Sequence, residues 1–281
     1  MPKLIETPAV IKAASRWKLV HKKRRIFVFL FSLMLFLVAC NFEKDQTTQQ
    51  SKSGSVCAIL AHPDDETIIS GTLAMLSSQG FDMTVVYVTS GDDGPDMTGR
   101  GLYGSALAEE REKEALHALQ ALGIKTSPVF LRFPDGHVHQ YVDSVQQILE
   151  DLLEKIKPQI IISFGPDGIT GDWDHMSTGT ATDMAFDQTD SGSLLLHMAI
   201  TKPFPPFYAN GVAVPKNKVD VRVKVSRYSR QRALAVEAHQ TQFNNRVRSA
   251  YKVYVHTMRK EKFIIARNRN ADDWLERYFS Y

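Results

Sequence analysis

Short apolar runs recur along the chain after residue 55. Largely apolar stretches at 56–60, 83–88, 129–133 and 159–164 contain few polar residues on either face. Runs of this length and continuity predict strands that are buried on both sides, as in a parallel sheet. Beyond residue 186 the pattern is weaker: residues 194–200 are mostly apolar, and further strands are expected at 219–225 and 262–266.

Segments with apolar residues at helical spacing separate these runs. They stop at residues that end helices, namely Gly80, Gly123 and Pro158. The expected helices cover residues 67–79, 105–122, 141–157 and 230–242. Strands that alternate with helices predict one Rossmann-like α/β domain over residues 56–281, with a mostly parallel sheet and helices on both faces.

The first 55 residues have a different pattern. A basic cluster at 22–25 precedes an apolar run at 26–38, which is too short to span a membrane and has the length of a signal-peptide core. The run ends in Leu-Val-Ala-Cys, which resembles a bacterial lipobox. Residues 1–39 are therefore expected to be a lipoprotein signal peptide, and Cys40 a lipidated N-terminus. A plain signal anchor with an incidental cysteine is the alternative.

Residues 40–55 are polar and lack apolar periodicity, so they are expected to form a flexible tether. The predicted location is the cell envelope, with the domain anchored to a membrane by lipid and facing away from the cytoplasm.

The expected signal peptide accounts for the net charge of +3, because residues 1–39 hold eight Lys or Arg and one Glu. The remainder is slightly acidic, so its bulk charge does not suggest a surface that binds nucleic acid.

Chemistry is indicated first by the sequence Ala-His-Pro-Asp-Asp-Glu at 61–66, directly after a predicted strand. His62 and Asp65 are residues that bind divalent metals, and they are close enough to share one ion. Asp64 lies between the two and is a candidate general base toward an activated water. An acid-rich helix N-terminus, favoured by the helix dipole, is the alternative.

A third ligand is expected at His175, which follows the loop after the strand at 159–164. Parallel strands place their carboxyl ends at the same edge of a sheet, so His175 would meet His62 and Asp65 there. Two histidines and one carboxylate, with one position left for water, form a catalytic zinc site. Asp174 is then a candidate to orient a ligand. His137 and His139 form a rival metal site, although two histidines in a loop are more commonly exposed residues that bind no metal.

Several segments together resemble the LmbE-like or PIG-L family, the N-acetylglucosaminyl-phosphatidylinositol de-N-acetylases. The resemblance rests on segments that occur in the family's order: 61–66, Arg111 and Glu114 ahead of Leu122-Gly123, Phe-Pro-Asp-Gly at 133–136, Asp174-His175, and Ala-His-Gln-Thr-Gln at 238–242. It implies a Zn²⁺-dependent hydrolase that removes an acetyl or similar acyl group from a small-molecule or glycan amino-sugar substrate.

The resemblance also implies roles for three further residues. Arg111 would hold substrate or order the pocket, Asp135 would bind substrate, and His239 would line the site. A solvated helix face is the alternative for Arg111, and a surface histidine is the alternative for His239.

One position departs from the family pattern. Members carry His-Pro before the Asp-His pair, where this chain has Asp172 and Trp173. Asp172 would stabilise an oxyanion only if burial kept it protonated. Two alternatives to a deacetylase follow: a sugar-binding lipoprotein with impaired catalysis, and a zinc amidase or esterase for another substrate.

Overall fold

The computed structural model describes residues 54–202 and 212–269, together with Ala271, Leu275 and Phe279. All of them belong to the compact unit Ser51–Tyr281. The signal peptide, Cys40 and nearly all of the tether lie outside the described residues, so lipidation and location stay predictions. Within the described part of the chain, no helix is both long and apolar enough to cross a membrane.

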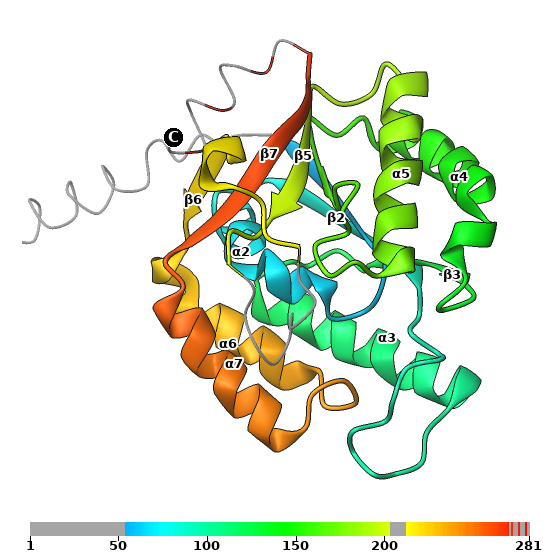
Figure 1. Cartoon of the computed structure of the whole chain (residues 1–281), viewed down its shortest axis with the longest axis vertical. Coiled ribbons are helices and arrows are strands. Elements are labelled where there is room, and N and C mark those ends of the chain that lie inside the picture. Colours follow the sequence, from blue (N-terminus) through cyan, green and yellow to red (C-terminus); the bar gives the residue numbers. More distant parts are fainter. Residues whose placement is uncertain (1–53, 203–211, 270, 272–274, 276–278, 280–281) are drawn as a thin grey trace, which may run out of the picture. The chain divides into compact units, whose positions relative to one another are not determined.

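A seven-stranded sheet forms the centre of the domain, in the order β3-β2-β1-β4-β5-β7-β6 (Figure 1). Its first five strands are parallel, and β7 runs antiparallel to both of its neighbours. The predicted mostly parallel α/β sheet is therefore confirmed. The strands are β1 (Ser55–Leu60), β2 (Asp82–Thr89), β3 (Val129–Phe133), β4 (Ile160–Ser163), β5 (Leu194–Ala199), β6 (Val221–Lys224) and β7 (Lys260–Asn268).

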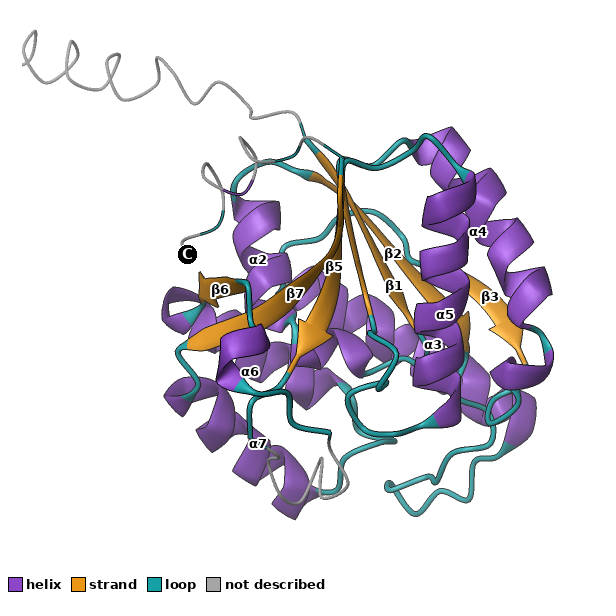
Figure 2. Ribbon diagram, turned by 45° about the horizontal axis from the view of Figure 1, so that its top comes forward, coloured by secondary structure: helices purple, strands orange, loops and turns teal. Residues whose placement is uncertain are grey.

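Helices cover both faces of the sheet, as predicted (Figure 2). Two apolar cores result, one between the sheet and α2, α3 and α6, and the other between the sheet and α4 and α5. The helices are α2 (Ser70–Ser78), α3 (Gly104–Ala121), α4 (Val142–Ile156), α5 (Trp173–Gln188), α6 (Ser229–Ala238) and α7 (Asn245–Thr257).

Strand β1 shows how the apolar runs build both cores. Val56, Ala58 and Leu60 belong to one core, whereas Cys57 and Ile59 belong to the other. Successive side chains of a strand point to opposite faces, so a strand covered on both sides must be apolar at every position. Burial also raises the pKa of the Cys57 thiol to about 12, which fits an inert core residue.

The strand order also fixes where a ligand site can lie. β1 pairs with β2 on one side and with β4 on the other, so the sheet is built outward from β1 in both directions. Open α/β sheets form a crevice at such a switch point, beyond the carboxyl ends of the strands. The segment 61–66 follows β1, and the loop that leads to His175 follows β4.

Helix α5 comes unusually close to the end of β4. An added Cβ at Gly179 would lie 2.7 Å from the carbonyl oxygen of Phe164, a distance that side chains do not tolerate. Glycine at this position lets the helix approach the strand end. The first turn of α5, which carries His175, is thereby placed at the switch point.

Candidate metal and catalytic site

His62, Asp65 and His175 converge at the carboxyl ends of β1 and β4. The Nδ1 atom of His62 lies 3.1 Å from Nε2 of His175, which in turn lies 3.2 Å from an Asp65 carboxylate oxygen. His62 Nδ1 lies 3.7 Å from the other carboxylate oxygen of Asp65. The three residues thus form one of the groups able to hold a metal ion.

These distances suit a small tetrahedral ion. Bonds of about 2.0–2.1 Å place neighbouring ligands of a tetrahedral zinc ion about 3.3 Å apart. Two imidazole nitrogens and one carboxylate oxygen are also a donor set that zinc accepts, with a fourth position left over. The three side chains therefore fit the predicted metal in both geometry and chemistry.

Contacts behind the ligands fix which atoms face the metal position. The Nδ1 atom of His175 lies 3.0 Å from the Gly168 carbonyl oxygen, which can only accept, so this nitrogen carries the hydrogen and Nε2 is left with a lone pair. One oxygen of Asp65 accepts from the backbone N–H groups of Ala61 and His62 at 3.1 and 2.7 Å. Its other oxygen is the one nearest His175.

His62 is oriented by two carboxylates. Its Nε2 atom lies 3.1 Å from Asp135 and 3.4 Å from Asp174, so Nδ1 is directed toward His175. Burial lowers the pKa of His62, but the two carboxylates outweigh burial and raise it well above the usual value. Carboxylates that favour a charged ring also favour a metal cation, so metal binding will displace a proton from this ring.

Asp174 is held rigidly from its other side. It is 1% exposed and accepts from the backbone N–H groups of Gly136 and Val138 at 2.7 and 3.0 Å. Burial raises its pKa, but the His62 contact and these two N–H groups hold the pKa below the usual value. Asp174 thus contacts the ligand that it was predicted to orient, and Asp135 contacts the same ring nitrogen.

Changing Asp174 to Asn should weaken metal binding without removing a ligand. The amide supplies no charge to the His62 ring, and loss of such an orienting carboxylate typically costs about 10–100-fold in metal affinity. Competition with a chromophoric zinc chelator measures the effect. Asp183→Asn is the matched control, because Asp183 contacts His197 instead. Unchanged affinity in Asp174→Asn would contradict the orienting role.

Two rival metal positions fit less well. Asp135, Asp174 and His62 form a second candidate group on the Nε2 side of the ring. There the Asp174 carboxylate already accepts from two backbone N–H groups. His137 and His139 are both exposed with ring centroids 6.3 Å apart, and neither joins a candidate group among the residues described.

Asp64 stands beside the three ligands in an unusual backbone conformation. Its φ of 127° lies in a region that residues other than glycine seldom occupy, and such strain is often retained at functional sites. Burial, followed by the neighbouring Asp65 carboxylate, raises the pKa of Asp64 to about 7. A carboxylate with this pKa is suited to accept and return protons near neutral pH.

Arg111 and Glu114 are buried, so the alternative of a solvated helix face is wrong. Glu114 accepts from the backbone N–H groups of Gln240 and Thr241 at 3.0 and 2.9 Å. These bonds end α6 at Ala238, earlier than the periodicity predicted, and hold the following turn against the site. Arg111 donates to the Pro95 carbonyl oxygen at 3.2 Å beneath the loop that follows β2.

The loop at 91–95 leaves room for the Arg111 guanidinium. A Cβ atom at Gly94 would lie 2.4 Å from an Arg111 nitrogen. Gly94, Pro95 and Arg111 all line the cavity at the metal site, so the loop after β2 forms part of the rim of this cavity.

His239 lies behind Asp64 rather than on the open surface. It is fully buried and bonded to the Glu66 carboxylate, which also accepts from the Tyr87 hydroxyl at 2.8 Å. Burial lowers the pKa of His239, but Glu66 outweighs burial and raises it. Neither Glu66 nor Tyr87 was predicted from the sequence, although Glu66 closes the segment 61–66 that first indicated a site.

Asp172 occupies a different environment from the one its predicted role requires. One oxygen accepts from the backbone N–H groups of Asp174 and His175 at 2.8 and 3.3 Å, so Asp172 is the N-cap of α5. Its side chain lines the cavity but is exposed. The burial that would let it donate a proton to an oxyanion is absent. Its observed contacts position the first turn of α5, which carries His175.

The ligands, Asp64 and Arg111 open onto a cavity of about 390 Å³. This volume lies within the range of small-molecule sites, roughly 300–1,000 Å³. Its lining also includes Gln242, from the segment 238–242 that resembles the family, together with Thr67, Phe243 and Tyr251, which were not predicted from the sequence. The arrangement combines a three-ligand metal position with one carboxylate suited to proton transfer, as metal-assisted hydrolysis requires. The buried Arg111 guanidinium lies in the same lining.

Comparison by sequence finds one deacetylase family and relatives that are named as deacetylases. A family model described as "PIG-L: GlcNAc-PI de-N-acetylase" matches residues 57–186. A 1D-myo-inositol 2-acetamido-2-deoxy-alpha-D-glucopyranoside deacetylase of Corynebacterium glutamicum is 31% identical, covering 46% of this chain and 52% of its own length. A probable N-acetyl-alpha-D-glucosaminyl L-malate deacetylase 2 of Bacillus anthracis is 25% identical over an alignment that covers 71% of this chain and 86% of that protein. The chain spans about half the length of the first of these relatives.

Solved structures share the fold at lower identity. An N,N'-diacetylchitobiose deacetylase from Pyrococcus horikoshii matches with a TM-score of 0.59 and 20% identity, over 79% of this chain and 87% of that one. GalB, a 4-carboxy-2-hydroxymuconate hydratase from Pseudomonas putida, matches with a TM-score of 0.60 and 17% identity, over 78% of this chain and 97% of that one. A hydratase among the matches means that the fold alone does not fix the reaction.

Proposed function

We propose that the protein is a zinc-dependent N-deacetylase of an amino-sugar substrate, on the premise that residues 57–186, which match the PIG-L family model, form a domain of that family. The relatives named above are deacetylases of N-acetylglucosaminyl compounds. The observation that carries the proposal is the triangle of His62, Asp65 and His175 with Asp64 beside it, because this arrangement supplies both a metal position and a proton acceptor.

The roles of the residues follow from their positions. A bound zinc ion supplies Lewis acidity toward an amide carbonyl and a water molecule. Asp64 takes the proton from the attacking water and returns it to the departing amine nitrogen, which leaves acetate and a free amino sugar. The buried Arg111 guanidinium lines the same cavity and is placed to hold a polar group of the substrate. Asp135 and Asp174 keep His62 in the ligand orientation.

The cellular setting is part of the proposal. The Leu-Val-Ala-Cys sequence and the preceding basic and apolar segments support a lipid anchor at Cys40. Such an anchor would hold the domain at the cell envelope, on a membrane face outside the cytoplasm, where acylated amino sugars of the envelope are accessible.

One observation favours a second candidate function. Asp172 caps α5 and is exposed, so the position where family members carry a histidine supplies no evident proton donor. A protein that binds an acetylated amino sugar without turning it over would also fit this site.

Acetate release, and its dependence on the metal, distinguishes the two candidates. We expect the full chain to release acetate from simple N-acetylglucosaminides, to lose this activity after treatment with a strong chelator, and to regain it on addition of zinc. Acetylated amines without a sugar and simple acetate esters serve as control substrates and should react much more slowly. Metal-independent acetate release would contradict the zinc role, and binding of the sugar without any release would favour the second candidate.

A further inference from the structure

The peptide unit that joins Pro63 to Asp64 is held on both sides by side chains. Its carbonyl oxygen, which belongs to Pro63, accepts from the Gln242 amide at 3.2 Å. Its N–H group, which belongs to Asp64, donates to the Glu66 carboxylate at 3.1 Å. The two polar groups of an ordinary trans peptide point in opposite directions, so these contacts together fix the plane of the unit. The orientation of this plane relative to the rest of Asp64 is the φ angle of that residue.

Asp64 needs such support because its backbone is strained. Its φ of 127° and ψ of −18° lie outside the regions that residues with a Cβ atom favour. A strained conformation persists only where the surrounding contacts over-determine it. If the Pro63–Asp64 peptide relaxed, the Asp64 carboxylate, which now lines the cavity beside the metal ligands, would move with it. The two contacts therefore determine where the proposed proton acceptor lies.

Glu66 is itself fixed by groups from elsewhere in the fold. It is fully buried, and one of its oxygens is bonded to Nε2 of His239, which lies 173 positions further along the chain. The other oxygen, which accepts from the Asp64 N–H group, also accepts from the Tyr87 hydroxyl at 2.8 Å. A glutamate of a capping box makes only a local bond to a backbone N–H group. Glu66 adds two contacts with distant side chains, so its role goes beyond capping.

The two distant contacts that hold this peptide, His239 and Gln242, belong to one turn after α6. The Glu114 carboxylate of α3 accepts from two backbone N–H groups of this turn and from the Thr241 hydroxyl at 2.6 Å. A single turn, fixed to α3, thus reaches one side of the peptide directly and the other side through Glu66. Glu66, His239 and Gln242 together form a clamp on the peptide that precedes Asp64.

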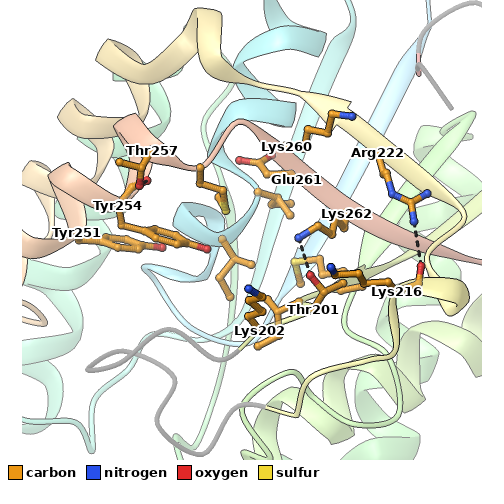
Figure 3. Close-up of a pocket in the computed structure, with 16 residues that line it drawn as sticks. Thr201, Lys202, Lys216, Arg222, Tyr251, Tyr254, Thr257, Lys260, Glu261 and Lys262 are labelled. Carbon is orange, nitrogen blue, oxygen red and sulfur yellow. Dashed lines mark hydrogen bonds between the residues drawn. The ribbon is translucent and has the colours of Figure 1, made fainter.

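The helical turn that follows Asp64 has an anchor of its own. Tyr251 of α7, which Figure 3 shows beside Tyr254 at one wall of a neighbouring cavity, donates to Thr67 Oγ1 at 3.1 Å. Thr67 belongs to the short 3₁₀ helix Asp65–Ile68. Loss of a clamp contact should therefore release the Pro63–Asp64 peptide while this helix, which begins with a metal ligand, stays in place.

We propose that Glu66 and Gln242 are positioning residues of the reaction, which with His239 fix the Pro63–Asp64 peptide and so orient the Asp64 carboxylate in the metal-site cavity. The inference rests on the proposed deacetylase function, in which Asp64 moves the proton, and it adds the residues that place Asp64 correctly. Misplacement of a reacting group by about 1 Å costs roughly 100-fold in rate, so contacts that only hold a backbone still affect turnover.

Glu66→Met tests the clamp in the full chain, because methionine is similar in size but cannot accept from the Asp64 N–H group. We expect kcat to fall at least about 10-fold, with KM and zinc affinity within about twofold of wild type. In Glu66→Gln the amide oxygen can still accept this bond, so kcat should be within about threefold of wild type. Combined with Asp64→Asn, Glu66→Met should cause no further loss, because no proton acceptor is left to orient.

Thr72→Val is the control for a loss of stability alone. Thr72 is fully buried on α2, and its hydroxyl donates to the Glu261 carboxylate of β7 at 2.6 Å. The variant loses this buried hydrogen bond, but it should keep the kcat of wild type below its melting transition. An equal fall of kcat in Thr72→Val and Glu66→Met overturns the inference. An equal fall caused by Glu66→Met with and without Asp64→Asn also overturns it.

Melting temperatures test the clamp without any activity. Glycine adopts a φ of 127° without the strain that alanine has there, so Asp64→Gly should melt above Asp64→Ala. Gln242→Met removes the donor to the Pro63 carbonyl oxygen, and it is expected to fold because Gln242 is only partly buried. In this background residue 64 can relax, so the difference should vanish or reverse, since glycine then only adds freedom to the unfolded chain.

The two measurements separate this inference from the proposed function. A difference between Asp64→Gly and Asp64→Ala that Gln242→Met leaves unchanged overturns the clamp, whatever the activity. If wild type releases no acetate from any substrate, the proposed function fails, and the melting comparison still decides whether the clamp holds the turn. Acetate release that falls in Glu66→Met, returns in Glu66→Gln and depends on Asp64 supports the positioning role.

Discussion

The Asp64→Asn variant is expected to lose about 10²–10⁴-fold in kcat while it keeps its metal. The amide cannot accept the proton of the attacking water, and proton transfer by a positioned side chain contributes an acceleration of this size. Asp64 does not belong to the group formed by His62, Asp65 and His175, so the change leaves the metal position intact. Acetate release and metal content, measured on the same preparation, check both halves of this expectation.

Asn is the informative substitution because of the backbone at residue 64. Asn, like Asp, adopts positive φ more readily than other side chains, so the strained turn at φ 127° is preserved. The change also removes the carboxylate that burial and Asp65 bring to a pKa of about 7. Asp82→Asn is the matched control, since Asp82 is exposed at the start of β2, the opposite end of that strand from the site. Full activity in Asp64→Asn would show that another group accepts the proton.

Much of the fold follows from residues that act locally. The runs that became β1, β2 and β4 are apolar because both faces of those strands are covered. His175 lies far from His62 in the chain, yet both follow strands that pair in parallel, so their meeting could be predicted from topology alone. Beyond α5 the pattern predicted strands but not their order, because β6 carries charges at alternate positions, as half-exposed strands do, and β7 begins with three charged residues.

What the sequence did not reveal depends on contacts between distant segments. The bond between Glu66 and His239 arises only when α6 packs against the turn after β1, and the hold of Glu114 on the turn after α6 arises only when α6 packs against α3. Asp172 is a different case, because its contacts are local. The sequence made a role in oxyanion stabilisation depend on burial, whereas Asp172 is exposed and caps α5 through two backbone N–H groups.

The His175→Ala variant is expected to lose both the bound metal and measurable turnover. A zinc site with two protein ligands is far weaker than one with three, so the loss of affinity should exceed the 10–100-fold typical of an orienting residue. His175 is the ligand whose Nε2 atom lies nearest both of the others, at 3.1 and 3.2 Å. Metal analysis of purified wild type and variant gives the primary measurement, with near-stoichiometric zinc expected only in wild type.

A structural defect has to be separated from the loss of a ligand, because the His175 ring also stacks on Phe164 with centroids 4.1 Å apart. His175→Gln retains most of the side-chain volume but removes the imidazole, so it should also lack zinc while melting close to metal-free wild type. Added zinc stabilises a protein that binds it, by about 2.7 kcal/mol when free zinc is roughly 100-fold above the dissociation constant. That rise in melting temperature should occur in wild type and be absent in both variants.

His139→Ala completes the comparison, because His139 belongs to the rival pair and is exposed. Its zinc content and its zinc-dependent rise in melting temperature should equal those of wild type. Zinc retained in His175→Ala but lost in His139→Ala would move the metal to the rival pair and leave Asp64 without its proposed role. The opposite result ties the metal to the carboxyl ends of β1 and β4, where the parallel strands bring the two histidines and Asp65 together.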